Sequence, residues 1–265
     1  MNILVTGSKG FLGSYLCQHL RKFQLNVVEL HRGVLDLTNS SQVNEFFSRT
    51  DNFDCVIHCA AKGGSRLKED ESTVLNDNLR MYYNLLDNRK SYHKFISFGS
   101  GAELYKTNTA YGFSKKIIYE SIKKNDYFYN LRIYGLFNYG ELNTRFIKSN
   151  LLKLIYNEDM VVHKNKYMDF FHMDDILKLI NFYIFSENLP KVVDCCYKDK
   201  INLFDICKEI SKLDQSYSKK IKILEAGEDA EYTSRYRDLP IKCQSLSDRI
   251  KQTHKELIAD IGYWS

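Results

Sequence analysis

The N-terminal segment reads Asn2-Ile3-Leu4-Val5-Thr6-Gly7-Ser8-Lys9-Gly10-Phe11-Leu12-Gly13 and sets the architecture of the chain. Its first five residues have the pattern of a short buried strand, and a helical pattern begins at Phe11, after a glycine-rich turn with G-x-x-G-x-x-G spacing. Glycines permit a tight turn and let a pyrophosphate approach the backbone at the positive end of the following helix. With a second strand at residues 26–30, the segment completes a βαβ unit and predicts a dinucleotide-binding loop.

Strand-like runs alternate with helix-like segments through the first half of the chain. The strands are expected at 2–6, 26–30, 54–58, 94–98 and 128–133, and the helices at 11–23, 40–49, 73–88 and 111–124. This alternation is typical of an α/β protein with a doubly wound parallel sheet, the Rossmann architecture. Ligands then bind beyond the carboxyl ends of the strands, where the sequence places residues 7–13, Cys59-Ala60-Ala61, Gly99-Ser100-Gly101 and Tyr134-Gly135.

The alternation loosens after residue 135. Helices are expected there at 144–156, 174–186 and 203–213, and short strands at 160–163 and 192–195. A chain of 265 residues that is 44% hydrophobic suffices for one sizeable core with a smaller appended region. We therefore predict a dinucleotide-binding region at 1–135. Residues 136–265 are expected to complete the sheet and to form a small C-terminal substrate-binding cap, within a single integrated domain.

The composition excludes several classes of function. The net charge of +5 comes from lysines that are spread thinly, so no nucleic-acid partner is implied. The N-terminus is already strand and glycine turn, and no apolar run of membrane-spanning length occurs, which predicts a cytoplasmic protein with no membrane partner. The seven cysteines form no C-x-x-C pair and are expected to be reduced core residues, so no metal site is predicted.

Tyr111 and Lys115 stand four residues apart in Ala110-Tyr111-Gly112-Phe113-Ser114-Lys115. At this spacing the two side chains share one face of a helix, where an ammonium lowers the pKa of a phenol. A phenol activated in this way exchanges protons readily, which is oxidoreductase chemistry. An ordinary solvated pair gives the same pattern, but the glycine loop earlier in the chain favours the catalytic interpretation.

The helix expected at 73–88 has apolar residues on two faces. One face carries Leu75, Leu79, Tyr82 and Leu86, and the other carries Val74, Met81 and Leu85. Two buried faces need two neighbours, of which the sheet is one. The second is another subunit, which would make the protein a homodimer, or the cap, unless Met81 and Leu85 are simply half exposed.

Together these motifs resemble the extended short-chain dehydrogenase/reductases, in the nucleotide-sugar epimerase/reductase branch known as the NAD-dependent epimerase/dehydratase family. The resemblance covers most of the chain. It rests on residues 6–13, 35–38, 56–61 (V-I-H-C-A-A), Asn78, 99–103, the Tyr111 and Lys115 pair, 131–135, and 168–175 (M-D-F-F-H-M-D-D). Met168 stands where the family has an arginine, which leaves the diphosphate contact at that position open.

The resemblance implies a catalytic triad. Ser100 would hydrogen-bond the reacting sugar oxygen, Tyr111 would exchange a proton with it, and Lys115 would hold the nicotinamide ribose and lower the tyrosine pKa. The implied cofactor-binding residues are Gly7, Lys9, Gly10, Phe11, Leu12, Gly13, His31, Arg32, Asp36, Leu37, Cys59, Ala60, Ala61, Asn78, Tyr111 and Lys115. The expected substrate residues are Ser100, Gly101, Tyr134, Arg145, His172 and Arg235, with the two arginines as candidates for the diphosphate.

The end of the second expected strand indicates which cofactor is used. An acidic residue there binds the ribose 2′-hydroxyl of NAD, whereas an arginine accommodates the 2′-phosphate of NADP. The sequence has His31-Arg32 at this point, with Lys9 in the glycine loop. Glu29 is the competing acid, but it lies inside the strand. The sequence therefore predicts NADPH over NADH.

Cofactor preference bears on the reaction, because epimerases of this group recycle a bound NAD and net reductases consume NADPH. We therefore expect reduction of a nucleoside-diphosphate 4-keto-6-deoxy sugar to the deoxyhexose, for surface polysaccharide assembly. Dehydration is disfavoured, since Ser100-Gly101-Ala102-Glu103 stands where dehydratases have T-D-E. A 4-epimerase with stored NAD is the alternative enzyme, and a dinucleotide-sensing regulator without catalysis is the alternative of another class.

Overall fold

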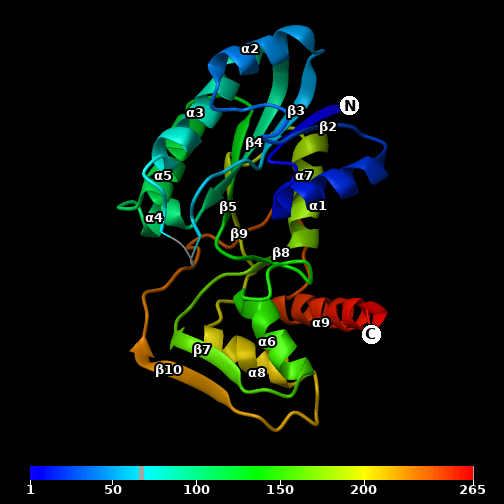
Figure 1. The fold of residues 1–265 in the computed structure, drawn as a ribbon, viewed down its shortest axis with the longest axis vertical. Coiled ribbons are helices and arrows are strands. Elements are labelled where there is room, and N and C mark those ends of the chain that lie inside the picture. Colours follow the sequence, from blue (N-terminus) through cyan, green and yellow to red (C-terminus); the bar gives the residue numbers. More distant parts are fainter. Residues whose placement is uncertain (66–68, 265) are drawn as a thin grey trace. The chain divides into compact units, whose positions relative to one another are not determined.

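The computed structural model describes residues 1–65 and 69–264, with the backbone alone for 263 and 264. The chain folds into two compact units (Figure 1). The first unit comprises Met1–Arg132 and Leu177–Val193, and the second comprises Ile133–Ile176 and the chain from Asp194 onward. The single boundary predicted at residue 135 does not include the return of residues 177–193 to the first unit. Such a return depends on long-range packing, for which the local pattern gives no signal.

A six-stranded sheet forms the centre of the first unit, in the order β2-β1-β3-β4-β5-β9. The strands are β1 (Asn2–Thr6), β2 (Asn26–Leu30), β3 (Phe53–His58), β4 (Tyr92–Ser100), β5 (Phe128–Ile133) and β9 (Val192–Cys195). β1 pairs in parallel with both β2 and β3, and β3 pairs in parallel with β4. The order reverses at β1, which is where a doubly wound sheet opens a crevice for a ligand. The predicted fold class is confirmed.

Helices cover both faces of this sheet (Figure 1). α2 (Ser40–Arg49), α3 (Val74–Asp87) and α5 (Ala110–Lys123) lie on one face, and α1 (Phe11–Leu20) lies on the other. Two of these helices begin where a side chain caps the first turn: Asn39 accepts from the Gln42 N–H at 3.1 Å, and Thr109 accepts from the Gly112 N–H at 3.1 Å. The core between sheet and helices includes Leu4, Val43, Phe47, Val56, Tyr82, Leu85, Phe95, Ile118 and Ile122.

The buried face of α3 differs from both faces predicted for it. Tyr82 and Leu85 are fully buried in the same core, and Met81 packs against that core. The sequence analysis placed Tyr82 and Leu85 on separate faces. Residues three positions apart lie on the same side of a helix, so these two side chains share one buried stripe. Leu85 and Met81, which motivated a second subunit, thus have neighbours within the first unit. The homodimer stays a prediction.

The sheets of the second unit are smaller than the sheet of the first unit. β6 (Leu136–Phe137) pairs in parallel with β8 (Phe171–His172), and β7 (Met160–Asn165) pairs in parallel with β10 (Ile221–Glu228). Its helices are α6 (Phe146–Ile155), the start of α7 (Met173–Phe185), α8 (Leu203–Ser211) and α9 (Leu246–Trp264). The sequence patterns did not predict β10 or α9. Seven of the eight residues of β10 are exposed, so the strand lacks the apolar alternation that marks a half-buried strand.

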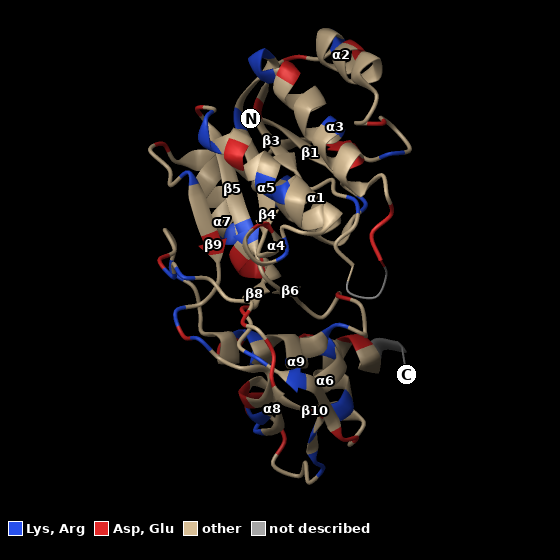
Figure 2. Cartoon of the chain, turned by 90° about the vertical axis from the view of Figure 1, so that its left-hand side faces the viewer, with Lys and Arg blue, Asp and Glu red and all other residues tan. Residues whose placement is uncertain are grey.

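Charged residues of both signs are interspersed over each unit (Figure 2), as the thin spread of lysines predicts. All seven cysteines are free thiols, and five of them are buried, which confirms the prediction of reduced core residues. Among residues 1–65 and 69–264, none of the helices combines the length and the apolar character that crossing a membrane requires.

Candidate active site

The glycine loop between β1 and α1 brings three backbone segments together. Gly7 has φ of +65°, and a Cβ at this position would lie 2.7 Å from the Ala60 nitrogen. A Cβ on Gly13 would overlap the Gly7 carbonyl oxygen. The loop is closed by a hydrogen bond from the Gly10 N–H to the Gly7 carbonyl at 2.9 Å. Only glycine fits such close approaches, and the turn leaves backbone amides at the start of α1.

A cavity of about 390 Å³ lies over this loop, at the carboxyl ends of the strands. Ten of the predicted cofactor residues line it: Gly7, Lys9, Gly10, His31, Arg32, Asp36, Leu37, Cys59, Ala60 and Ala61. Phe11, Leu12, Gly13, Tyr111 and Lys115 are not among its lining residues. Leu35 and Thr38, from the segment 35–38 that the resemblance includes, line it as well, and so do four residues that the sequence analysis missed, namely Leu30, Lys62, Asp77 and Met81. Lys62 directly follows the predicted Cys59-Ala60-Ala61, and a longer motif would have included it.

Asn78 lies beside the cavity as a structural residue. Its side chain is 2% exposed and accepts from the Lys62 N–H at 2.8 Å. Its amide donates to the Lys62 carbonyl at 3.0 Å and to the Ser114 hydroxyl at 3.1 Å. Asn78 therefore ties the segment after β3 to α5, and in this way shapes the wall of the cavity rather than lining it.

The charges around the cavity fall into two groups. Two carboxylates are already engaged: Asp36 accepts from the Thr38 N–H at 3.0 Å and from its hydroxyl at 2.8 Å, and Asp77 pairs with Lys62 at 3.0 Å. The hydrogen bonds from Thr38 keep the pKa of Asp36 below its usual range. Arg32 is exposed on the lining of the cavity. The cavity thus offers an accessible guanidinium for an anionic group.

The side chain of Glu29 is directed away from the cavity, as its place inside β2 predicts. Its carboxylate pairs with Arg21 at 2.6 Å, and the side chain is not among those that line the cavity. The one acid that would favour a ribose 2′-hydroxyl is therefore directed elsewhere.

Ser100, Tyr111 and Lys115 come together at the end of β4. The Ser100 hydroxyl is hydrogen-bonded to the Tyr111 side chain and accepts from the Ala102 N–H at 3.2 Å. Lys115 is 7% exposed and donates to the Phe98 carbonyl at 2.7 Å, and its Nζ lies 5.7 Å from the centroid of the Tyr111 ring. The i,i+4 spacing therefore places the amine and the phenol on one face of α5, beside the serine.

The protonation of these groups differs from the sequence prediction in one respect. Burial raises the pKa of Tyr111 to about 12, and the hydrogen bond from Ser100 opposes that rise. The net direction is therefore opposite to the lowered pKa that the sequence predicts for this phenol, because burial outweighs the influences that lower it. Burial lowers the pKa of Lys115 itself to about 8, since a charged amine loses its hydration in the interior. The spacing of the two groups was predictable from the sequence, but their desolvation was not.

The remaining predicted substrate residues belong to the second unit, apart from Gly101, which is buried at the start of α4 (Ala102–Tyr105) in the first. Tyr134 is 5% exposed, and its hydroxyl donates to Asp194 at 3.4 Å. Arg145 and Arg235 are both exposed, and Arg145 lies 3.6 Å from Glu141. Their roles toward a substrate stay predictions.

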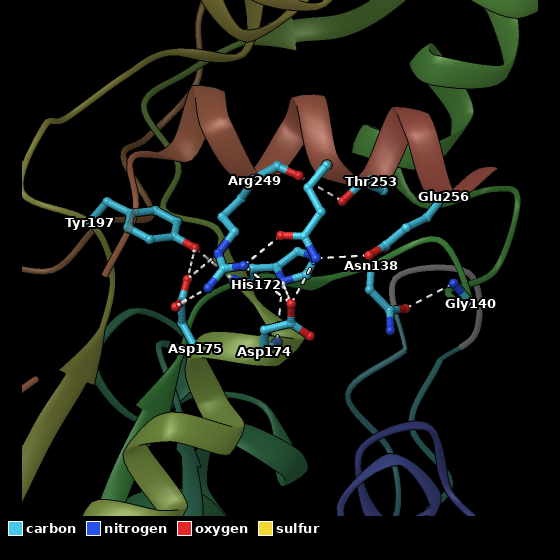
Figure 3. A network of polar contacts seen from close by, with 10 residues as sticks. Asn138, Gly140, His172, Asp174, Asp175, Tyr197, Arg249, Thr253 and Glu256 are labelled. Carbon is cyan, nitrogen blue, oxygen red and sulfur yellow. Dashed lines mark hydrogen bonds and ion pairs between the residues drawn. The ribbon is translucent and has the colours of Figure 1, made fainter. Parts of the chain in front are cut away.

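His172 lies in a buried polar network of the second unit (Figure 3). Its Nδ1 accepts from the Asp174 N–H at 3.2 Å. Arg249 on α9 donates from Nε to Asp175 at 2.7 Å and from Nη1 to Asp174 at 3.2 Å. The motif at 168–175 therefore supplies the carboxylates that anchor α9. Its second residue, Asp169, pairs with Arg237 at 3.0 Å, and Met168 is buried.

A family model of the NAD dependent epimerase/dehydratase family matches residues 3–195. The chain belongs to this family. Membership agrees with the glycine loop, the switch in strand order and the Tyr111 and Lys115 pair, and it makes the protein an NAD(P)-dependent enzyme that modifies nucleotide sugars. No curated protein matches the chain significantly in sequence.

Solved structures of other family members have the same fold. A GDP-L-fucose synthetase from Naegleria fowleri has a TM-score of 0.78 at 16% identity, over 98% of this chain and 94% of that one. A UDP-glucuronic acid 4-epimerase mutant from Bacillus cereus, in complex with a fluorinated substrate derivative and NAD, has a TM-score of 0.77 at 18% identity, over 98% and 100%. A GDP-6-OMe-4-keto-L-xylo-heptose reductase from C. jejuni has a TM-score of 0.77 at 15% identity, over 98% of each chain. At these identities the likeness extends to the fold alone.

Proposed function

We propose that this enzyme catalyses the NADPH-dependent reduction of a nucleoside-diphosphate 4-keto-6-deoxy sugar to the deoxyhexose, as a step in surface polysaccharide sugar biosynthesis. The observation that carries the proposal is the hydrogen-bonded pair of Ser100 and Tyr111 beside the buried amine of Lys115. A hydroxyl, a phenol and an amine held together in this way suit the transfer of a proton to a reduced carbonyl oxygen.

The residues of the cavity fit a dinucleotide. Gly7, Gly10 and the amides at the start of α1 suit a pyrophosphate, because the first turn of a helix presents unpaired N–H groups at its positive end. Asp36 and Leu37 line the same cavity, and their resemblance to the family's adenine-contacting segment supports a contact with the adenine here. When bound, the cofactor supplies the hydride for C4 of the sugar.

The choice of NADPH rests on the charges near the end of β2. Arg32 and Lys9 both line the cavity, and a guanidinium recognises a phosphate through several hydrogen bonds. Glu29 is engaged with Arg21, and Asp36 with Thr38. These contacts favour a 2′-phosphate over a bare ribose hydroxyl.

Each residue of the triad has one role in the proposed reaction. Ser100 donates a hydrogen bond to the carbonyl oxygen of the sugar. Tyr111 gives its proton to that oxygen as the carbonyl becomes an alcohol, and the pKa of about 12 keeps its hydroxyl protonated at neutral pH. Lys115 holds the nicotinamide ribose, and its charge stabilises the phenolate left on Tyr111.

The alternative is a 4-epimerase with a stored NAD. It is favoured by the equally close fold of the Bacillus cereus epimerase, whose complex contains NAD. The two functions differ in the state of Tyr111, because an epimerase first removes a proton from the sugar alcohol and then returns it. The raised pKa leaves Tyr111 protonated at neutral pH, which is the state from which a reductase starts.

Cofactor stoichiometry separates the two functions. The enzyme is supplied with NADPH and, in turn, with 4-keto-6-deoxy sugars linked to uridine, thymidine, cytidine and guanosine diphosphates. We expect one of these sugars to consume one NADPH per molecule and to give a single C4 alcohol, because a bound ketone presents one face to the nicotinamide. No loss of NADPH absorbance with any sugar, together with interconversion of a saturated nucleotide sugar, would assign the enzyme as an epimerase.

A further inference from the structure

Asp70 is a carboxylate of the segment after β3 that the proposed reaction does not use. The residue is half-buried, and its two oxygens accept hydrogen bonds from two separate parts of the first unit. Oδ1 accepts from the backbone N–H of Gly64 at 2.7 Å, and Oδ2 accepts from the backbone N–H of Tyr111 at 3.3 Å. The carboxylate therefore joins the glycine turn at Gly63 and Gly64 to the start of α5.

The glycine turn that Asp70 holds lies directly against the ring of Tyr111. Gly64 has φ of +73°, and a Cβ at this position would lie 2.8 Å from both Cε1 and Cζ of that ring. Gly63 has φ of +79°, and a Cβ there would lie 2.6 Å from Asp70 Oδ1. The left-handed backbone and the close approaches both require glycine at these positions. The glycine turn is thus one wall of the space that the phenol ring occupies.

The chain before the glycine turn is fixed as well. The backbone N–H of Lys62 donates to the side chain of Asn78 at 2.8 Å, and the Lys62 carbonyl accepts from the same side chain at 3.0 Å. Asn78 in turn donates to the Ser114 hydroxyl of α5. The glycine turn is therefore tied to α5 at both ends, through Asn78 before it and Asp70 after it.

The position of Asp70 also suits the electrostatics of α5. The first N–H groups of a helix have no partners within the helix. Thr109 accepts from the N–H of Gly112, and Asp70 accepts from the N–H of Tyr111. A carboxylate at this end of a helix is stabilised by the helix dipole. The residue that Asp70 holds by its backbone is thus the same residue whose ring the glycine turn contacts.

We propose that Asp70 is a positioning residue of this active site, which keeps the glycine turn against the Tyr111 ring and so fixes the direction of the phenol hydroxyl. The inference rests on the proposed function for its catalytic meaning, because this direction matters only if Tyr111 transfers a proton. A reacting group displaced by about 1 Å loses much of the rate. If Asp70 had a structural role alone, its removal would lower the stability of the protein and leave the ring in place.

The ring of Tyr111 gives a readout that needs no substrate. The protein is labelled with ¹³C at the ring ε positions of tyrosine, and the Tyr111 signal is identified by NMR from its loss in Tyr111→Phe. In Asp70→Ala we expect this signal to shift and the ring to rotate about tenfold faster, because the glycine turn no longer packs against it. Asp70→Asn keeps one acceptor oxygen and should give an intermediate rate.

The control for this measurement is Asp214→Ala. Asp214 is an exposed carboxylate that likewise accepts from a backbone N–H, that of Ser216 at 2.8 Å, but it lies in the second unit. The Tyr111 signal should keep its wild-type position and rotation rate in this variant. A change that Asp70→Ala alone produces is therefore specific to the contacts of Asp70.

Kinetics with the accepted 4-keto sugar test the catalytic part of the inference. Asp70→Ala should lose kcat about ten- to a hundredfold with little change in KM for NADPH or sugar, and Asp70→Asn should lose less. Gly64→Ala should lose kcat as well, because the added methyl group meets the Tyr111 ring. The matched control is Gly227→Ala, at φ of +84° with nothing within 4 Å of a Cβ. It has similar backbone strain and should keep the wild-type kcat.

A Tyr111 ring signal that keeps its position and rotation rate in folded Asp70→Ala would overturn the inference, and so would a wild-type kcat in Gly64→Ala. If Asp70→Ala fails to fold, Asp70→Asn gives the same readout, since it keeps one of the two contacts. If no keto sugar is reduced but the ring signal changes as expected, the proposed function fails and the positioning of the ring by Asp70 stands.

Discussion

The two units each contain a buried arginine paired with carboxylates, but the two clusters are built differently. In the second unit, Arg249 donates from Nε and Nη2 to the two oxygens of Asp175, and the Tyr197 hydroxyl donates to the same carboxylate at 2.8 Å (Figure 3). Tyr197 in turn accepts from the His172 N–H at 3.1 Å. These contacts join the motif at 168–175 to Arg249 of α9 and to Tyr197, which lies just after β9.

In the first unit, Arg132 and Asn130 both donate to one oxygen of Glu103. The other oxygen of Glu103 accepts from the backbone N–H of Ser100. The groups that this cluster holds have unusual protonation, namely a phenol with a pKa of about 12 and an amine with a pKa of about 8. Tyr197 of the second unit also has a raised pKa, so a perturbed group is a mark of function only together with the hydroxyl, phenol and amine chemistry gathered at the end of β4. Burial and ion pairing alone therefore do not distinguish a catalytic cluster from a structural one.

Tyr111→Phe should have the largest effect, and it tests the catalytic side of the comparison. The ring keeps its packing against Gly64, and only the hydroxyl is lost, so kcat should fall by about two to four orders of magnitude, the usual contribution of a general acid. The unfolding temperature should stay close to that of the wild type. Steady-state kinetics with the accepted 4-keto sugar make the measurement. The control is Tyr83→Phe, because the Tyr83 side chain is partly exposed. A near-wild-type rate would remove Tyr111 from the mechanism.

Arg249→Met tests the structural side. The substitution leaves Asp174 and Asp175 without their cation in a buried site, which costs about 3–5 kcal/mol in the free energy of unfolding. Denaturant unfolding measures the loss. Arg21→Met is the matched control, because its pair with Glu29 is exposed and should contribute less than about 1 kcal/mol. Equal losses in the two variants would contradict the assignment of this network to stability.

Arg32→Ala should have the smallest effect, and it tests whether Arg32 binds the 2′-phosphate of NADPH. Removing a charged partner of a phosphate should raise the Kd for NADPH about ten- to a hundredfold, while the Kd for NADH changes little. Calorimetry with both cofactors makes the measurement, and Arg49→Ala, an exposed residue of α2, is the control. Wild-type protein that binds NADH as tightly as NADPH would refute the role given to Arg32.

Local signals in the sequence were sufficient for the sheet and for the shared face of Tyr111 and Lys115. The glycine spacing at 7–13 and the i,i+4 spacing of these two residues each lie within one element and its adjoining turn. The hydrogen bond between Ser100 and Tyr111 was not predicted. Packing over long separations was not predictable in this way. The pairing of Glu103 with Arg132 joins residues 29 positions apart, and the network of Asp175 with Arg249 joins residues 74 apart. Desolvation depends on that packing, which is why the pKa of Tyr111 was predicted with the wrong sign.

Net transfer of hydride from the nicotinamide to the sugar can be followed with a deuterium label. NADPH that carries deuterium in the transferred position of the nicotinamide is mixed with the enzyme and the accepted 4-keto-6-deoxy nucleotide sugar, and the product is examined by NMR. We expect one deuterium at C4 of the product for each NADPH consumed, in a single configuration. A product that carries no deuterium at C4, formed without loss of NADPH, would contradict it.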